Sequence, residues 1–262
     1  SLRVWIDSSA ENEVMGKILS KELRVEAIQA KQTPTVAKSF ADDSWETIAA
    51  TVKAGNISTY QVGDTKEIDM GDLGTHIVRV ANTSECTNGE TSQTACGFVV
   101  EFADIISNQQ MNSTDTNVGG WPASSMRTYV NGTIYNALPS ELQNIITETS
   151  VVSGYGSGDS SNFTSTDKLY LLSTQEVWGG NSSYDTANST TRQLDYYRNK
   201  GVTTSNYSAA AKQYNGSYST WSLRSAFAPM SSVFWSTYTN GCNYGNSYAS
   251  SAYGVSPAFR IA

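Results

Sequence analysis

Residues 221–262 read WSLRSAFAPMSSVFWSTYTNGCNYGNSYASSAYGVSPAFRIA, and the interpretation of the whole chain starts from this stretch. Between Arg224 and Arg260 it contains no Asp, Glu, Lys, Arg or His. Tyr, Ser, Asn, Gly and Ala fill it, with bulky apolar residues among them. Aromatic anchors beside small hydrogen-bonding residues are typical of a recognition surface. A Tyr/Ser-rich edge of a sheet has a similar composition, so both interpretations stay open at this point.

Composition sets limits on the partners of the chain. The 262 residues carry a net charge of −7, which disfavours nucleic acid because phosphate binding needs a basic surface. Charged residues make up only 16% of the sequence, and such neutral, polar surfaces are common among secreted and cell-surface proteins. No stretch is long and apolar enough to cross a bilayer, so membrane insertion is not expected. The sequence opens SLRVW without an initiator Met or a signal peptide, and we expect a processed or trimmed fragment.

The three cysteines predict one disulfide. Cys86 and Cys96 flank a polar loop between two strand-like runs, a spacing that suits a disulfide closing a hairpin. Two unpaired thiols are the alternative. Cys242 is left over and lies inside the expected recognition surface.

The chain divides into an extension and a larger domain. Residues 1–32 alternate apolar and polar residues in strand-like runs, and residues 33–43 form a Pro-containing connector. A two-stranded unit is marginally stable alone, so these strands either pair with the larger domain or end an upstream β-sandwich. We therefore predict a β extension and connector over residues 1–43 and one domain over residues 44–262.

The domain shows an α+β pattern with two main helices and an irregular C-terminal region. Ser44 is expected to cap a short helix that Gly55 ends. A longer amphipathic helix is predicted over residues 124–138, where Pro139 ends it and Ser140 caps a further helical piece. Antiparallel strands are predicted over residues 61–70, 76–82, 97–106 and 167–172, with GFVVEF central, followed by a short helix over 209–213, an Asn240-Gly241 type I′ hairpin turn and a last strand at GVSPAFRIA.

Catalytic and metal-binding patterns are not found, so no catalytic residue, metal or cofactor is expected. The one histidine, His76, lies in an alternating strand, which is more often a structural position. The sequence has no GxSxG motif, no CxxC spacing and no calcium-loop pattern. Paired carboxylates suffice for glycoside hydrolysis, but no spacing singles out the acidic candidates, which are Glu101, Asp104, Glu176 and Asp185.

Several motifs in order resemble a domain family of undefined function found in surface and secreted proteins of Firmicutes. They are YQVGDTKEI (60–68), GGWPASSMRTYVN (119–131), IYNALPSELQNII (134–146), DKLYLLSTQEVWG (167–179), WSLRS (221–225) and YGVSPAFRI (253–261). The family usually has Trp-Trp-Leu-Arg-Ser, and Ser222 replaces its second Trp, which puts a detail of local packing in doubt. The N-terminal LRVWIDSS resembles the closing strands of camelysin-like surface proteins, which build matrix fibres.

The ending, WxLRS followed by a polar run and GVxPAF, resembles the C-type lectin fold in its formylglycine-generating-enzyme-like branch. That branch includes the variable proteins of diversity-generating retroelements in bacteria and phages, and the resemblance implies a variable C-terminal region within residues 221–262. Calcium-dependent sugar binding is not implied, because no Pro has the Glu-Pro-Asn or Gln-Pro-Asp context. Formylglycine-generating enzymes need two cysteines near the C-terminus, and only Cys242 is there.

These observations predict an extracellular or cell-surface recognition protein that binds a protein or glycan on another cell or surface. The residues expected as scaffold are Trp221, Leu223, Arg224, Gly241, Gly254, Val255, Pro257 and Phe259. The residues expected to contact the ligand are Phe227, Met230, Phe234, Tyr238, Asn240, Asn243, Tyr244, Asn246 and Tyr248. Alternation along the strand puts Trp235 in the core if Phe234 is outside. The alternative functions are a carbohydrate-active enzyme with paired carboxylates and a structural module of a surface fibre.

Overall fold

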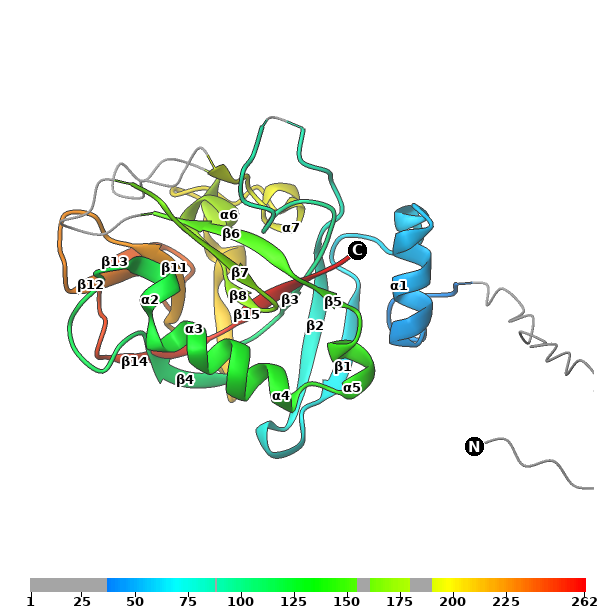
Figure 1. Cartoon of the computed structure of the whole chain (residues 1–262), viewed down its shortest axis with the longest axis horizontal. Coiled ribbons are helices and arrows are strands. Elements are labelled where there is room, and N and C mark those ends of the chain that lie inside the picture. Colours follow the sequence, from blue (N-terminus) through cyan, green and yellow to red (C-terminus); the bar gives the residue numbers. More distant parts are fainter. Residues whose placement is uncertain (1–36, 88, 155–160, 180–189) are drawn as a thin grey trace, which may run out of the picture. The chain divides into compact units, whose positions relative to one another are not determined.

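The computed structural model describes residues 37–87, 89–154, 161–179 and 190–262 (Figure 1). The chain divides into two compact units, Ser1–Thr35 and Val36–Ala262, and the division falls inside the predicted connector. The strand-like runs of residues 1–32 lie outside the described residues. Phe40 is fully buried and its ring contacts those of Trp45 and Tyr60, so the larger unit starts before residue 44.

The first helix forms where the sequence predicts it. Helix α1 (Trp45–Lys53) begins after Ser44, whose side chain accepts a hydrogen bond from the backbone N–H of Thr47. A cap of this kind satisfies one of the N–H groups that a helix start leaves without a partner. Its apolar side chains at helical spacing, Trp45, Ile48 and Val52, are buried. This prediction is confirmed.

A six-stranded sheet pairs early strands of the larger unit with its last strand. All of its strand pairs are antiparallel. Its order is β1 (Thr65–Asp69), β2 (Thr75–Asn82), β3 (Phe98–Phe102), β15 (Pro257–Ile261) and β5 (Ile146–Thr147), with β8 (Tyr170–Leu171) also paired to β15. Strand β3 is buried along its whole length between β2 and β15, so the predicted central position of GFVVEF is confirmed.

A five-stranded sheet carries most of the C-terminal region, so the prediction that this region is irregular is wrong. Its order is β13 (Asn243–Tyr248), β12 (Val233–Thr237), β11 (Trp221–Ala226), β14 (Ala252–Val255) and β4 (Ser107–Gln110). The pair β11–β14 is parallel and the other pairs are antiparallel. The predicted last strand is therefore two strands in different sheets, because the chain passes from β14 to β15 at the buried Ser256.

The helical stretch after β4 matches the predicted amphipathic helix. Ser124 caps it with a hydrogen bond from the N–H of Arg127, and Met126, Val130 and Ile134 are buried at a spacing of four residues. Pro139 separates it from the next short helix and occupies the N-cap position of that helix, so the prediction that Ser140 caps it is wrong. The elements are α2 (Gly120–Ala123), α3 (Ser125–Tyr129), a π-helical turn η4 (Val130–Ile134), α4 (Tyr135–Ala137) and α5 (Ser140–Gln143).

Two secondary-structure predictions need correction. The predicted strand over residues 167–172 is split, since β7 ends at Asp167 and β8 begins at Tyr170. The predicted helix over 209–213 is a single 3₁₀ turn, η6 (Ser208–Ala210), after which the chain enters strand β9 (Lys212–Tyr214). The Nζ atom of Lys212 reaches the carboxylate of Glu101 in the core, and this tertiary contact outweighs the local helix propensity.

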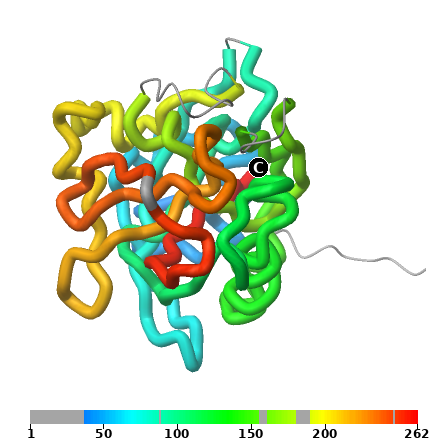
Figure 2. The backbone as a smooth tube through the Cα atoms, turned by 90° about the vertical axis from the view of Figure 1, so that its left-hand side faces the viewer, coloured from blue at the N-terminus to red at the C-terminus, as the bar shows by residue number. Residues whose placement is uncertain are grey.

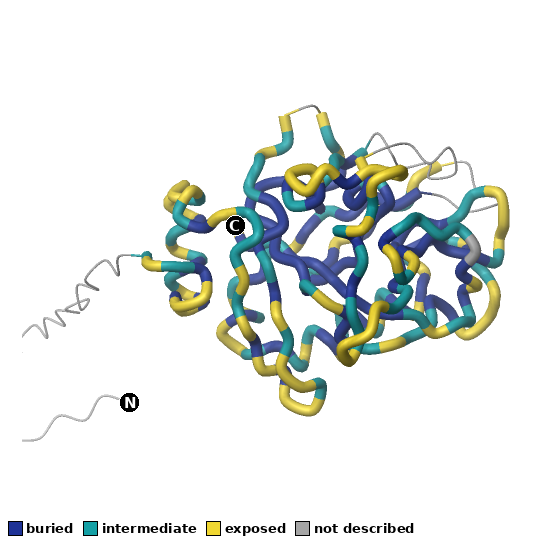
Figure 3. Tube along the Cα trace, turned by 180° about the vertical axis from the view of Figure 1, so that it is seen from behind, coloured by how far each residue is buried: buried dark blue, intermediate teal, exposed yellow. Residues whose placement is uncertain are grey.

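The remaining elements complete an α+β unit. Dark blue, buried backbone runs through the middle of the unit in Figure 3, and exposed residues concentrate at turns. These elements are β6 (Thr149–Ser153), β7 (Phe163–Asp167), α6 (Thr174–Trp178), α7 (Asp195–Asn199), β10 (Ser217–Ser219) and the 3₁₀ turns η2 (Ile57–Thr59) and η3 (Gly71–Leu73). Cys86 and Cys96, the expected pair, form a disulfide in the loop between β2 and β3. Within the described residues, no helix has the length and apolar character needed to span a membrane.

Candidate functional site

Strand β12 is the buried centre of the C-terminal hairpin. Phe234 is fully buried and Trp235 is only 5% exposed, although they are neighbours on one strand. The prediction that Phe234 contacts ligand is therefore wrong. Figure 2 shows the C-terminal strands, orange to red, on the side of the unit that faces the viewer. Strand β12 is paired with β11 on one side and β13 on the other, and all five of its residues are buried, so both of its faces are covered. Simple alternation of inside and outside residues consequently does not apply to it.

The other predicted contact residues divide into two groups. Tyr244 pairs with Ser236, and Tyr248 pairs with Val233. The register between β12 and β13 shifts between Phe234 and Ser236, where β13 has one additional residue. Because of this shift Tyr244 and Tyr248, although four residues apart, lie on opposite faces. We call Tyr238, Asn240, Asn243 and Tyr244 the tip cluster. We call Phe227, Met230 and Tyr248 the base cluster.

The tip cluster presents two aromatic rings beside two amides. The rings of Tyr238 and Tyr244 lie with centroids 5.2 Å apart and planes inclined by 39°. Tyr238 is 43% exposed and Asn240 is exposed, while Asn243 and Tyr244 are partly buried. An inclined pair of rings gains attraction beyond its buried area and restricts both side chains. The cluster therefore combines aromatic rings with hydrogen-bonding amide groups.

The turn between β12 and β13 is held in one conformation. The N–H of Tyr238 donates to the carbonyl of Cys242 at 2.8 Å, and the N–H of Gly241 donates back to the carbonyl of Tyr238 at 2.9 Å. Asn240 accepts from the N–H of Cys242 through its side chain. Only Gly241 has a positive φ, of 93°, so the turn is a three-residue loop and the predicted type I′ turn is wrong.

Gly241 also anchors the tip cluster to the rest of the unit. Its carbonyl accepts a hydrogen bond from Trp178 Nε1 at 3.1 Å. A Cβ atom at this position would lie 2.1 Å from the carbonyl oxygen of Tyr207. Only glycine fits this close approach of two backbones. Trp178 and Tyr207 were not identified from the sequence, because each lies more than thirty residues from the turn and no local pattern links them to it.

The base cluster is fixed from a distant part of the chain. Asn117 donates through its side-chain amide to three carbonyl oxygens, those of Phe227, Met230 and Val233. The ring of Phe227 lies edge-on against Trp235 at 5.2 Å. Met230 and Tyr248 are 38% and 45% exposed. The side chain of Asn246, also predicted to contact ligand, lies outside what the structure describes.

One acidic side chain borders the base cluster. Asp115 accepts hydrogen bonds from the backbone N–H and the hydroxyl of Ser250, and these bonds lower the pKa of its carboxyl group. An acidic group from elsewhere in the chain therefore lies beside the C-terminal end of the charge-free run, at Ser250. Sequence analysis missed Asp115 because it belongs to a loop more than a hundred residues before Ser250.

The residues expected as scaffold are all buried, and Arg224 shows how they act. Its guanidinium forms two hydrogen bonds of 2.6 Å to the carboxylate of Glu176 and another to the carbonyl of Leu171. Thr94, Thr191 and the N–H of Ser173 also donate to this carboxylate. Burial opposes ionisation of Glu176, but Arg224 and the other hydrogen-bond donors together outweigh burial and hold its pKa below the ordinary value. The pair ties β11 to α6.

A second buried network surrounds Glu101. Its carboxylate accepts from Arg79 at 3.0 Å, from Lys212 at 2.7 Å and from the hydroxyl of Tyr197 at 2.9 Å. Burial opposes ionisation here too, yet the two cations lower the pKa of Glu101. Burial lowers the pKa of Lys212 to about 8, despite the attraction of Glu101. This network joins β2, β3, α7 and β9.

Of the four carboxylates considered for acid–base chemistry, three lie in the described part of the chain. Glu101 and Glu176 are fully buried in ion pairs with lowered pKa values, whereas a general acid at neutral pH needs a raised one. Asp104 is exposed and accepts a hydrogen bond from the N–H of Gln213, and Asp185 lies outside the described residues. His76 is partly buried, and its ring bonds to the carbonyl of Leu73. No group of acidic, His or Cys side chains in the described part of the chain could hold a metal ion.

Comparison with known families covers most of this architecture. Residues 98–262 match a family described as a domain of unknown function, DUF6273. The chain belongs to the DUF6273 family. The matched DUF6273 region contains the entire five-stranded sheet and both clusters, whereas α1, β1 and β2 precede it. A search of curated proteins and a search of solved structures each found no match.

Proposed function

We propose that the chain is an extracellular recognition protein whose tip cluster binds a protein or a glycan. The observation that supports this most is the contrast within one hairpin. Strand β12 is buried on both faces, while the turn that follows it presents Tyr238 and Asn240 to solvent in a conformation fixed by Gly241. A preorganised aromatic surface binds without an additional entropic cost of ordering a loop.

The chemistry of the tip cluster suits a neutral ligand surface. The rings of Tyr238 and Tyr244 present apolar faces, and the amides of Asn240 and Asn243 both donate and accept hydrogen bonds. Sugar rings and uncharged protein surfaces both combine apolar patches with hydroxyl or amide groups. A surface without ionised groups also avoids the cost of removing water from charges on binding.

The proposal includes a C-type-lectin-like fold in its formylglycine-generating-enzyme-like branch and C-terminal variation by a retroelement. The polar run of residues 226–252 lies between buried scaffold residues, an arrangement that tolerates change at exposed positions. The Cys86–Cys96 disulfide fits an oxidising compartment outside the cytosol. If a retroelement varies this region, the genome should contain an imperfect repeat of the coding region for residues 226–253 beside a reverse transcriptase gene.

Binding measurements on the full chain test the proposal. Labelled protein is applied to an array of purified glycans and to immobilised cell-surface proteins. Tyr238→Ala and Asn240→Ala are each expected to weaken binding to the selected partner by about tenfold or more. Tyr218→Ala is the matched control, since Tyr218 is 59% exposed on the separate two-stranded sheet β9–β10.

Salt dependence provides a second readout. Affinity is expected to change by less than about twofold between low and high salt, because the tip cluster carries no charge to be screened. A steep loss of affinity with salt, or full binding by both tip variants, contradicts the proposal.

A further inference from the structure

Strand β1 is a sheet edge whose outer backbone groups have no partner among the described residues. It ends the six-stranded sheet, and β2 is its neighbour on the inner side. Val80 donates to the carbonyl of Asp64, and Met70 donates to the carbonyl of Gly74, so the even-numbered residues of β1 bond to β2. The alternation of an antiparallel pair then directs the N–H and C=O of Glu67 and Asp69 outward. Within the described residues, no backbone hydrogen bond uses these outward groups.

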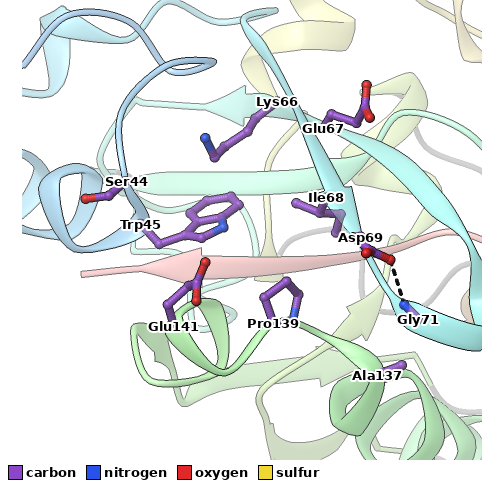
Figure 4. A pocket seen from close by; sticks show the side chains of 10 residues that line it. All are labelled: Ser44, Trp45, Lys66, Glu67, Ile68, Asp69, Gly71, Ala137, Pro139 and Glu141. Carbon is purple, nitrogen blue, oxygen red and sulfur yellow. Dashed lines mark hydrogen bonds between the residues drawn. The ribbon is translucent and has the colours of Figure 1, made fainter.

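A pocket of about 500 Å³ lies along this edge. One side is formed by consecutive residues of β1, and the other by the start of α1 and the α4–α5 connection. Pockets of this size accommodate small ligands or several side chains of a peptide. Figure 4 shows Trp45, Ile68 and Pro139 around the opening, with the carboxylate of Glu141 beside Trp45 and the side chain of Glu67 directed away. An added strand would therefore face an apolar floor on one side.

The accessible charges along the edge are negative. Glu67, Asp69 and Glu141 are exposed. Lys66 is the cation of the pocket, but its Nζ donates to the carbonyls of Ala41 and Asp43 at 2.8 and 2.9 Å. Its ammonium group also lies 5.5 Å from the centre of the Trp45 ring. Lys66 is thus held against the protein by groups of its own chain.

The two faces of β1 differ in a way that specifies a ligand pattern. The side chain of Ile68 points toward the apolar side of the pocket. Glu67 and Asp69 occupy the alternate positions and lie on the other face of the strand, where the exposed Ile77 is paired with Glu67. Side chains of an added strand alternate in the same way. Apolar side chains would meet Trp45 and Ile68, and basic side chains would meet the carboxylates.

We propose that the outer edge of β1 binds an extended peptide segment of another protein in which apolar and basic residues alternate. Backbone hydrogen bonds to Glu67 and Asp69 would add the segment to the sheet as a further strand. Charge complementarity favours this partner over a second copy of the chain. Two copies paired edge to edge would bring Glu67 and Asp69 close to their counterparts, and charged edge residues of this kind oppose such pairing.

The test uses a fluorescent hexapeptide that alternates valine and lysine, titrated with the full chain. Two peptide controls are matched to it. In one, glutamate replaces lysine, and in the other three valines precede three lysines, so that charge is kept and alternation is lost. Both controls are expected to bind at least about tenfold more weakly than the alternating peptide. The same loss is expected for the alternating peptide N-methylated at every second residue. The proposal is overturned if the peptide with three valines before three lysines, or the N-methylated peptide, binds as tightly as the alternating peptide. It is also overturned if the alternating peptide does not bind at about 1 mM.

Protein variants locate the site. Glu67→Pro removes an outward N–H while leaving the pairing with β2, since proline is tolerated at such edge positions. Glu67→Pro is expected to bind the alternating peptide about tenfold more weakly than Glu67→Ala, which keeps the N–H. The double variant Glu67→Lys with Asp69→Lys is expected to prefer the glutamate peptide. Unchanged preference in that variant, or an edge-dependent dimer without peptide binding, overturns the proposal. Tyr238→Ala leaves this binding unchanged, so the two binding sites are tested separately.

Discussion

The interior of the C-terminal sheet and the tip of its hairpin use opposite kinds of polar chemistry. Arg224 on β11 is fully buried and ion-paired to Glu176, whereas the tip cluster at the end of β12 presents only phenol and amide groups. The charged groups lie where the protein joins segments that are far apart in sequence. The neutral groups lie at the turn, where Tyr238 and Asn240 are exposed to solvent.

The buried charged groups help to specify the fold, whereas the neutral tip cluster is the surface that we propose for ligand binding. A buried ion pair adds little net stability compared with a well-packed apolar pair, but loss of one partner leaves an uncompensated charge in the core. The pairs Arg224–Glu176 and Lys212–Glu101 therefore penalise wrong arrangements of β11, α6, β3 and β9. A neutral aromatic surface has no comparable penalty and tolerates substitution. Substitutions in the two regions test this contrast.

The largest effect is expected from Arg224→Met. It leaves the carboxylate of Glu176 buried without its cation, and we expect a loss of about 3–5 kcal/mol in the free energy of unfolding. The matched control is Arg198→Met, because Arg198 also pairs with a carboxylate, that of Asp195, but is 52% exposed. A loss below about 1 kcal/mol is expected there. Urea denaturation measures both, and equal losses would remove the contrast between buried and exposed pairs.

A smaller effect is expected at the glycine that holds the turn. Gly241→Ala combines a positive φ with a clash against the carbonyl of Tyr207, and we expect a loss of about 3 kcal/mol. Gly216→Ala has a similar φ, of 79°, but no atom within 4 Å of the added Cβ, so only about 1 kcal/mol is expected. Thermal unfolding of the two variants gives the difference. If both variants lose the same stability, the close approach to Tyr207 does not restrain the tip.

Acid is expected to weaken the interior before it changes the tip. The folded-state pKa values of Glu176 and Glu101 lie below the ordinary value of 4.5. Their contribution to stability is therefore complete above pH 4.5 and is lost as the pH falls through the lowered values. Urea midpoints should be level down to about pH 5 and fall below it. Glu176→Gln should flatten this fall, and an unchanged acid slope in that variant would contradict the assignment.

Local signals in the sequence predicted a substantial part of the fold. Ser44 caps a helix where its side chain suggested, the predicted amphipathic helix starts at Ser124, and the unbroken apolar run GFVVEF is the central strand β3. Each of these features depends on a few neighbouring residues, which is why a single sequence shows them. The scaffold residues around the polar run, Trp221 and Phe259 among them, are buried as expected.

The errors arise where distant contacts decide the outcome. Phe234 was expected outside because alternation assumes one covered face, but β12 is covered on both. Lys212 enters a strand because its Nζ reaches Glu101, 111 positions away. Glu176 was considered for catalysis, although it is the partner of Arg224. A pattern in one sequence does not show which residues meet across such separations.

The smallest effect concerns the two rings of the tip cluster. Tyr238→Ala alone should change the free energy of unfolding by no more than about 0.5 kcal/mol, because the side chain is 43% exposed and is not part of the core. A double-mutant cycle with Tyr244→Ala isolates the contact between the rings, for which we expect a coupling of about 0.5 kcal/mol. A measurable coupling means that the rings hold each other in place before any partner arrives. If the coupling is zero while Tyr238→Ala still weakens binding, Tyr238 contacts the partner directly but is not preorganised by Tyr244. The tip would then not be rigid in the way that the interior is.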